Sequence, residues 1–144
     1  MENKVTRVRT EILEFPDKDG NKIYDHKIEF SDGTKCSVSR KFDKNNNEIY
    51  YETSKGYWKR FEYDENGNLI YTEDSHGVWK KFKYNEQGKK TYYEDSFGCI
   101  IKYEFNEHGH RTLKEILDRD CVREKIEYSP DGTIELDRLT EVIL

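Results

Sequence analysis

The sequence predicts an all-β protein: tandem antiparallel β-hairpin repeats with a period of about 21 residues, forming a twisted meander sheet or a β-solenoid-like array. Three observations predict this class. Aromatic residues recur every 21 positions, at Phe42, Tyr63, Tyr84 and Phe105. Two sets of turn residues recur in phase with them. Aromatics make up 14% of the chain while hydrophobic residues reach only 33%, so burial has to come from amphipathic rings rather than a thick aliphatic core.

Two turns divide each repeat into two short strands. The first turn carries Asn46, Gly67, Gly88 and Gly109, and the second carries Gly56, Gly77 and Gly98. Asn and Gly supply the positive φ angles that tight turns need. Strands of about five to seven residues fit between the turns, and their Tyr, Phe, Trp, Ile and Thr content favours strand over helix. Only the segment LKEILDRD at 113–120 is compatible with a helical turn.

The repeats place the whole chain, 1–144, in one domain. Residues 41–133 hold the core repeats, and residues 1–40 are expected to form divergent N-terminal capping hairpins. Residues 134–144 are expected to be a C-terminal cap or a dimerisation segment. This apolar tail either covers the open end of the sheet or pairs with a second copy of the chain. An exposed edge strand can also pair with a second copy.

Alternation along a strand assigns side chains to two faces. Tyr57 and Phe61 share one face, which we expect to be an apolar seam, while Trp58 and Arg60 share the other. Trp79 repeats Trp58 one period later, so the second face combines tryptophans with charge. We expect one column from the other strand of each unit to join the apolar seam: Tyr50, Tyr71, Tyr92 and Leu113.

The stretch YDENGNL at 63–69, with relatives at 42–48, 84–90 and 105–111, resembles the YD repeat of the RHS/YD family. The resemblance covers roughly residues 40–133. It implies a β-hairpin sheet that coils or curls, and in the family such arrays form shells or extended surfaces, some linked with carbohydrate binding and toxin delivery. Later copies replace the Asp by Asn, and the array is too short to close a large shell, so the resemblance carries over repeat geometry rather than residue roles.

Charge and motif content argue against several functions. The net charge of −5 provides no basic field for direct nucleic-acid binding, and no apolar run is long enough for a membrane span, so we expect a cytoplasmic protein. Cys36, Cys99 and Cys121 have neither disulfide-framework nor metal spacing. His108 and His110 flank a turn glycine without completing a metal site, and repeated carboxylates do not form one asymmetric catalytic pocket. We therefore expect no enzyme activity and no cofactor.

Binding to a protein partner is the function that the sequence favours, because exposed tryptophans beside cations are typical of interface hot spots. We expect a non-enzymatic repeat module, for example a phage or immunity-type inhibitor that blocks a nucleic-acid-handling defence protein through an acidic, aromatic-rich surface. A carbohydrate-binding module and a structural oligomerisation element, such as a homodimer through an edge strand or the apolar tail, are the alternatives. The candidate binding residues are Trp58, Trp79, Glu52, Glu73, Glu94, Asp74, Asp95, Asp118 and Asp120.

Overall fold

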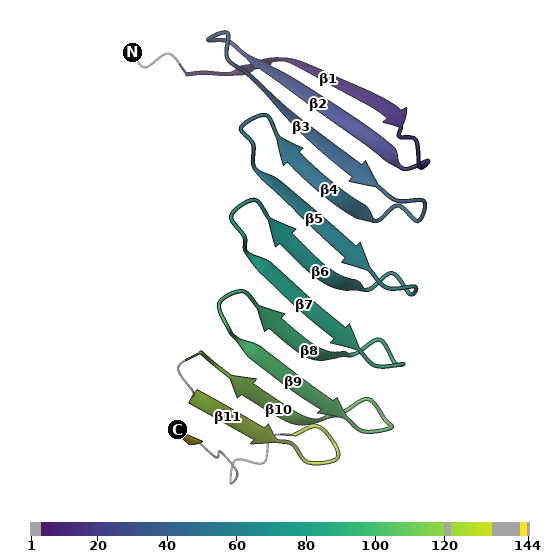
Figure 1. Cartoon of the computed structure of the whole chain (residues 1–144), viewed down its shortest axis with the longest axis vertical. Helices are drawn as coiled ribbons and strands as arrows, with labels where there is room; N and C mark the ends of the chain where they lie inside the picture. Colours follow the sequence, from purple (N-terminus) through teal and green to yellow (C-terminus); the bar gives the residue numbers. More distant parts are fainter. Residues whose placement is uncertain (1–3, 120–121, 134–141, 144) are drawn as a thin grey trace.

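The computed structural model is one open antiparallel sheet in which the strands follow one another in chain order (Figure 1). The structure describes residues 4–119, 122–133 and 142–143. The strands are β1 (Arg7–Pro16), β2 (Lys22–Phe30), β3 (Lys35–Phe42), β4 (Glu48–Thr53), β5 (Trp58–Tyr63), β6 (Leu69–Asp74), β7 (Trp79–Tyr84), β8 (Lys90–Asp95), β9 (Ile100–Phe105), β10 (Arg111–Leu117), β11 (Val122–Glu127) and β12 (Val142–Ile143). The predicted meander of hairpins is confirmed.

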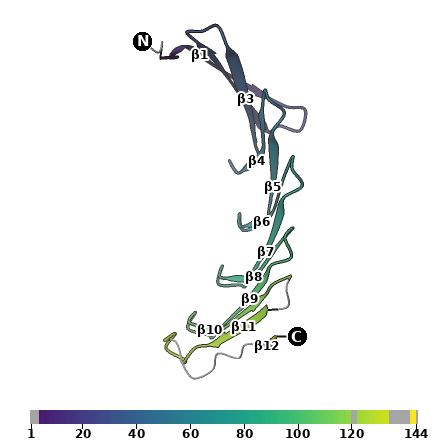
Figure 2. The ribbon, with the colours of Figure 1, turned by 90° about the vertical axis from the view of Figure 1, so that its left-hand side faces the viewer.

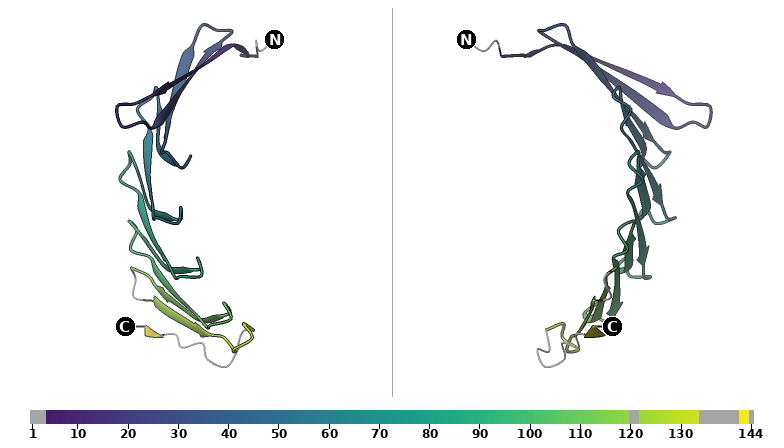
Figure 3. Two further views of the ribbon diagram at one scale, coloured as in Figure 1. Left: turned by 90° about the vertical axis from the view of Figure 1, so that its right-hand side faces the viewer. Right: turned by 60° about the vertical axis from the view of Figure 1, so that its left-hand side comes forward.

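The sheet bows along its length, so that seen edge-on it traces an arc from β1 to β11 (Figures 2 and 3). The residues 1–40 that were expected to form divergent hairpins contribute β1, β2 and β3 to the same sheet. Residues 134–144, for which a cap or a dimerisation segment was expected, lie outside the described residues except for the two residues of β12. The described strands form an open meander rather than a closed coil.

The first turn of each repeat is built on one carboxylate or amide. Asp64 Oδ1 accepts the backbone N–H groups of Asn66 and Asn68 at 2.9 and 2.8 Å, and Gly67 takes a φ of 81°. Asn85 Oδ1 does the same in the next copy, accepting backbone N–H groups at 3.0 and 2.9 Å. The change from Asp to Asn in later copies therefore preserves the turn, because only a side-chain oxygen acceptor is required.

The register between strands shifts once in each repeat. The irregularity lies between Lys41 and Phe42, and again between Glu62 and Tyr63. Each shift inserts one extra residue opposite the aromatic column and changes which side chains share a face. Tyr50 consequently lies opposite Arg60.

This register makes one sequence-based assignment wrong. Directly paired residues point to the same side of a sheet, and three members of the column pair with Arg60, Lys81 and Lys102. The fourth lies opposite Glu104. The column Tyr50, Tyr71, Tyr92 and Leu113 therefore joins the face of the tryptophans and not the face of Phe61. The next residue along each strand takes its place on the face of Phe61. Tyr93, for example, lies opposite Phe82 with ring centroids 5.7 Å apart.

The one segment that was compatible with a helical turn is not helical among its described residues. The segment at 113–120 that was compatible with a helical turn lies in β10 as far as Leu117, and every regular element among the described residues is a strand. Ile116 pairs with Ile101 of the neighbouring strand. Sheet pairing on both sides of β10 overrides the local preference of Leu, Lys and Glu for helix.

Both faces of the sheet remain open. Among the described residues no apolar side chain is buried, and Thr72 is the single buried residue, with 5% of its surface exposed. The chain exposes 10615 Å², whereas a compact monomer of 17.4 kDa would expose about 7,900 Å². Stability therefore comes from backbone ladders and cross-strand side-chain pairs between neighbours, in place of one central core.

Candidate functional site: the tryptophan face

One side of the sheet carries both tryptophans. Glu73 lies opposite Arg60 on one neighbouring strand and opposite Trp79 on the other. Tyr50 lies opposite Arg60, and its ring stacks against that of Trp58 with centroids 6.4 Å apart and planes 17° apart. These five residues define the tryptophan face. The prediction that Trp58 and Trp79 share a face is confirmed, with Tyr71 and Glu73 of β6 between their strands.

Cations cover several rings of this face. The Lys81 ammonium lies 4.6 Å from the Trp79 ring, and the Arg60 guanidinium lies 5.4 Å from the Tyr71 ring. Each such contact contributes about 0.5–1 kcal/mol at an exposed site and favours the ring position in which it forms. Arg60 Nε also donates a hydrogen bond of 2.8 Å to Glu73 Oε2. The contacts therefore favour one arrangement of these rings and cations before any partner binds.

A shallow hollow of about 750 Å³ lies in the middle of this face. Tyr71 and Tyr92 supply apolar ring surface in it, and Arg60, Lys81 and Glu94 supply charge. Its sides are open and no side chain encloses it. Such a hollow can receive a protruding side chain, but it does not remove reactants from water as a catalytic pocket does.

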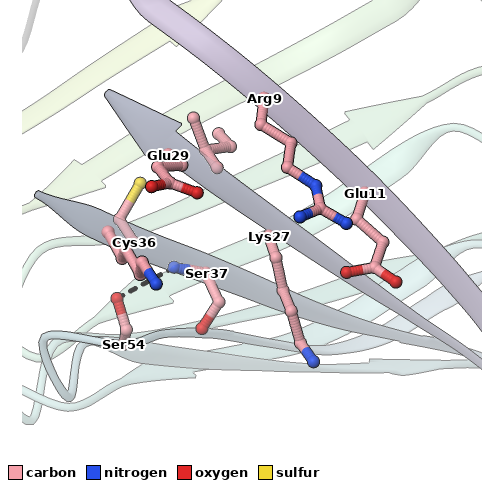
Figure 4. A pocket seen from close by; sticks show the side chains of 9 residues that line it. Arg9, Glu11, Lys27, Glu29, Cys36, Ser37 and Ser54 are labelled. Atoms are coloured by element: carbon pink, nitrogen blue, oxygen red, sulfur yellow. Dashed lines mark hydrogen bonds between the residues drawn. The ribbon is translucent and has the colours of Figure 1, made fainter. Parts of the chain in front are cut away.

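Two further hollows lie on the same side of the sheet, over β1 to β4. One, of about 450 Å³, is lined by residues that include Asp25, Ser39 and Glu52, which form a row of paired positions across β2, β3 and β4. The other, of about 330 Å³, is lined by residues that include Arg9 and Glu29 (Figure 4). All three hollows therefore open on the tryptophan face, which is aromatic in its middle and polar toward β1.

The structure brings together five of the nine predicted site residues. Trp58, Trp79, Glu52, Glu73 and Glu94 all lie on the tryptophan face, and each glutamate is paired with a tryptophan or a cation: Glu52 with Trp58, Glu73 with Arg60 and Trp79, and Glu94 with Lys81. The acidic column is thus interleaved with a basic one and does not form an anionic strip.

Asp74 and Asp95 have a different position. They lie at the second turn of their repeats and pair with Lys59 and Lys80, on the opposite face. Asp74 Oδ1 accepts the backbone N–H of His76 at 2.9 Å. Burial of Asp74 raises the pKa of its carboxyl. The backbone hydrogen bonds from His76 and Val78 outweigh burial and hold this pKa below its usual 3.8. These aspartates fix turns.

The last two predicted acids lie away from the face as well. Asp118 follows β10, is exposed, and accepts the backbone N–H of Arg119. Asp120 lies outside the described residues. The segment that follows β10 therefore adds neither of these two predicted acids to the tryptophan face among the residues that the structure describes.

Sequence reasoning missed the tyrosines of this site. Tyr50, Tyr71 and Tyr92 were assigned to the opposite face because the register shift was not anticipated. The available signal was the phase of the basic column: Arg60 and Lys81 recur with the same period, and a cation directly opposite an aromatic residue is a favourable cross-strand pair.

No family model matches the chain, and no curated protein matches it either. The resemblance to YD repeats therefore stays a prediction. Within the described ranges no three His, Cys, Asp or Glu side chains are grouped to hold a metal ion. His110 of the turn pair instead places Nδ1 3.0 Å from the carbonyl oxygen of Pro130. No helix in the described part of the chain could cross a membrane.

Proposed function

We propose that this chain is a non-enzymatic module that binds another protein across the tryptophan face. The observation that carries this proposal is the combination of rings and cations at an open hollow on a sheet that no second layer covers among the described residues. Trp, Tyr and Arg dominate the binding energy of protein interfaces, because they bury large areas with few rotatable bonds. Tyr71 and Arg60 line one depression. Trp79 lies beside it, in contact with the ammonium of Lys81, which also lines it.

The charge pattern narrows the class of partner. Glu73 and Glu94 lie directly opposite Arg60 and Lys81, so positive and negative side chains alternate along the middle of the face. Such a surface fits a partner with apolar anchors and a rim of mixed charge. Its affinity should depend only weakly on salt, because attraction and repulsion largely cancel beyond a Debye length.

The narrower function, inhibition of a nucleic-acid-handling defence protein, makes a different demand. A surface that imitates phosphate has to present acids whose charge is not neutralised by adjacent cations. A steep loss of affinity with added salt would favour this narrower function. An affinity that does not change with salt would be consistent with the general protein-binding module and would exclude phosphate mimicry as the mechanism.

The test is partner capture with matched variants. Immobilised wild-type chain is incubated with an extract of the source cells, beside Trp58→Ala and Trp79→Ala. Phe97→Ala is the control, because Phe97 is exposed to 63% and lies at the turn between β8 and β9. We expect a protein that wild type and the control retain and both tryptophan variants lose, and an affinity at least about tenfold weaker for each variant with the purified partner.

Two results would contradict the proposal. Capture that is unaffected by both tryptophan substitutions, with native circular dichroism spectra, would exclude this face as the binding surface. Failure to capture any protein, combined with a saturable change in tryptophan fluorescence on adding oligosaccharides, would indicate a carbohydrate-binding module, since sugar rings also stack on aromatic side chains.

A further inference from the structure

The strand β1 leaves one complete edge of the sheet without a partner among the described residues. It is ten residues long and exposed throughout, and it pairs only with β2. Val8 and Ile12 expose 61% and 62% of their surfaces. Edge strands of soluble proteins are usually short, charged, bulged or covered, because free N–H and C=O groups recruit another strand. The register of β1 is irregular only between Arg7 and Arg9.

The order of charges along β1 indicates which strand could pair with this free edge. Arg7 and Arg9 precede Thr10 in the strand, and Glu11 and Glu14 follow it. An antiparallel copy of the same strand brings the basic half of each against the acidic half of the other. We propose that β1 pairs antiparallel with β1 of a second copy of this chain, about a twofold axis that passes midway between Thr10 and its equivalent in the other copy.

The register follows from symmetry. A twofold axis perpendicular to the sheet keeps each face on the same side, so one residue has to pair with its own equivalent, and the axis passes midway between the two. An axis at Arg9 would oppose two arginines, and an axis at Glu11 would oppose two glutamates. With the axis at Thr10, Arg9 lies opposite Glu11 of the second copy, twice.

Within each chain Arg9 already lies opposite Glu29, and Glu11 lies opposite Lys27. The proposed pairing extends these pairs into a row across the junction, in which Lys27 and Glu11 of one copy are followed by Arg9 and Glu29 of the other. Charges alternate along the whole row, which is favourable for cross-strand neighbours.

The apolar side chains fit the same register. Val8 is the extra residue at the irregularity between Arg7 and Arg9. Where the new ladder continues regularly past Arg9, Val8 of one copy would lie opposite Ile12 of the other, and the twofold axis repeats this pair on the other side of Thr10. Two of the most exposed apolar residues of the chain would then cover each other. The tryptophan faces of the two copies would share one side of a continuous sheet, so the association adds to the proposed binding function without depending on it.

Sedimentation equilibrium over a concentration series tests the pairing. Wild type should reach twice the monomer mass of 17.4 kDa, with concentrations on the order of 100 µM included because an interface of this size is usually weak. Ile12→Lys should weaken the dimer at least about tenfold, since two buried ammonium groups would face the apolar pair. Phe97→Lys is the matched control, with 63% of Phe97 exposed far from β1, and should keep the wild-type dissociation constant.

Exchange of the charges tests the register. Arg9→Glu and Glu11→Arg each place like charges opposite one another in the proposed dimer, so each variant alone should be monomeric where wild type is dimeric. Mixed in equal amounts, the two variants should form a heterodimer, because each junction pair again joins an acid and a base. A variant that had merely lost β1 from its sheet could not regain pairing in the mixture.

Three outcomes would overturn the proposal: a wild-type monomer at every concentration, open-ended polymers that indicate joining of β1 to the opposite edge, or a dimer that Ile12→Lys leaves unchanged. A mixture of the charge variants that stays monomeric, with native circular dichroism spectra, would reject the register. If either charge variant loses the native spectrum, the comparison of Ile12→Lys with Phe97→Lys decides the matter.

Discussion

The hydroxyl of Tyr84 donates a hydrogen bond of 2.9 Å to the backbone carbonyl of Leu69, the first residue of the neighbouring strand β6. Tyr63 makes the same bond to the carbonyl of Glu48, one repeat earlier and also at 2.9 Å. Both acceptors open a strand beside the register shift of their repeat. The aromatic column that reveals the period thus also supplies a polar partner where the backbone ladder is irregular.

Tyr84→Phe should lower the free energy of unfolding by about 1 kcal/mol, because it removes one hydrogen bond and keeps the ring. Urea unfolding followed by circular dichroism measures the change. Tyr103→Phe is the control: the Arg111 guanidinium lies 4.7 Å from the Tyr103 ring, a contact that survives the loss of the hydroxyl. Equal effects of the two substitutions would show that the bond to Leu69 contributes nothing specific.

Asp64→Asn should lower the thermal unfolding midpoint only slightly, whereas Asp64→Ala should lower it clearly. The asparagine keeps the oxygen that accepts the N–H groups of Asn66 and Asn68, as Asn85 does in the next repeat, and loses only the bond that Asn68 Nδ2 donates to Asp64 Oδ2. Alanine leaves the backbone N–H groups of Asn66 and Asn68 bonded only to water, so the turn loses the side-chain acceptor that stabilises it. Differential scanning calorimetry measures both variants, and a midpoint unchanged in Asp64→Ala would contradict the role assigned to the carboxylate.

Alkaline pH should destabilise the sheet, with the free energy of unfolding falling between about pH 10 and pH 12. Burial, followed by a hydrogen bond to Asp95, raises the pKa of Tyr93 from 10.0 to about 12. The folded chain therefore holds this proton more tightly than the unfolded chain, so the stabilisation is complete below pH 10 and is lost as pH rises through the folded pKa. The same direction holds for the pKa values of six other tyrosines, Tyr24, Tyr50, Tyr57, Tyr63, Tyr84 and Tyr92.

Urea midpoints measured from about pH 8 to pH 12, beside the absorbance of the phenolates, test this dependence. Tyr93→Phe should reduce the slope of stability against pH in the alkaline range, because one linked proton is removed. A midpoint that stays constant to pH 12 would contradict the expectation.

Deletion of residues 64–84 should give a shorter protein that still folds. The deletion removes one whole repeat and joins Tyr63 to Asn85, which restores the aromatic residue and its turn acceptor at the junction. Strands contact only their neighbours in the sequence, so the remaining pairs keep their partners. The circular dichroism spectrum and the dispersion of amide signals in a nuclear magnetic resonance spectrum measure the outcome.

Deletion of residues 64–74 is the corresponding negative control. It removes β6 with one turn and reverses the direction in which every later strand has to run. We expect loss of cooperative unfolding in this variant. If both deletions behaved alike, the hairpin pair would not be the structural unit of the chain.

The sequence determined the turns and strands well, because both depend on local chemistry. Gly67 and its equivalents have the positive φ angles that their spacing indicated. The strand boundaries follow from the ten-residue distance between turns. In contrast, the face of Tyr50 depended on a single extra residue in the ladder, and a one-residue shift moves a whole column to the other side.

Two other features could not be read from the repeat. The absence of a buried apolar core among the described residues is a property of the whole assembly of strands, to which no single motif points. The edge strand Arg7–Pro16 lies outside the period, so no repeat column singled out its charge order. Of the predicted site residues, the tryptophans and glutamates lie together on one face, whereas Asp74 and Asp95 lie at turns on the opposite face.

The pairing of each strand with only its sequence neighbours also determines how the molecule would respond to force. Pulling β1 and β11 apart loads the sheet across its strands, so the backbone bonds of one ladder open in succession instead of shearing together. Each repeat that detaches releases about 21 residues, or roughly 70 Å of extended chain. The protein would therefore lengthen in even steps at low tension and recover its length when the tension falls, as an elastic tether does.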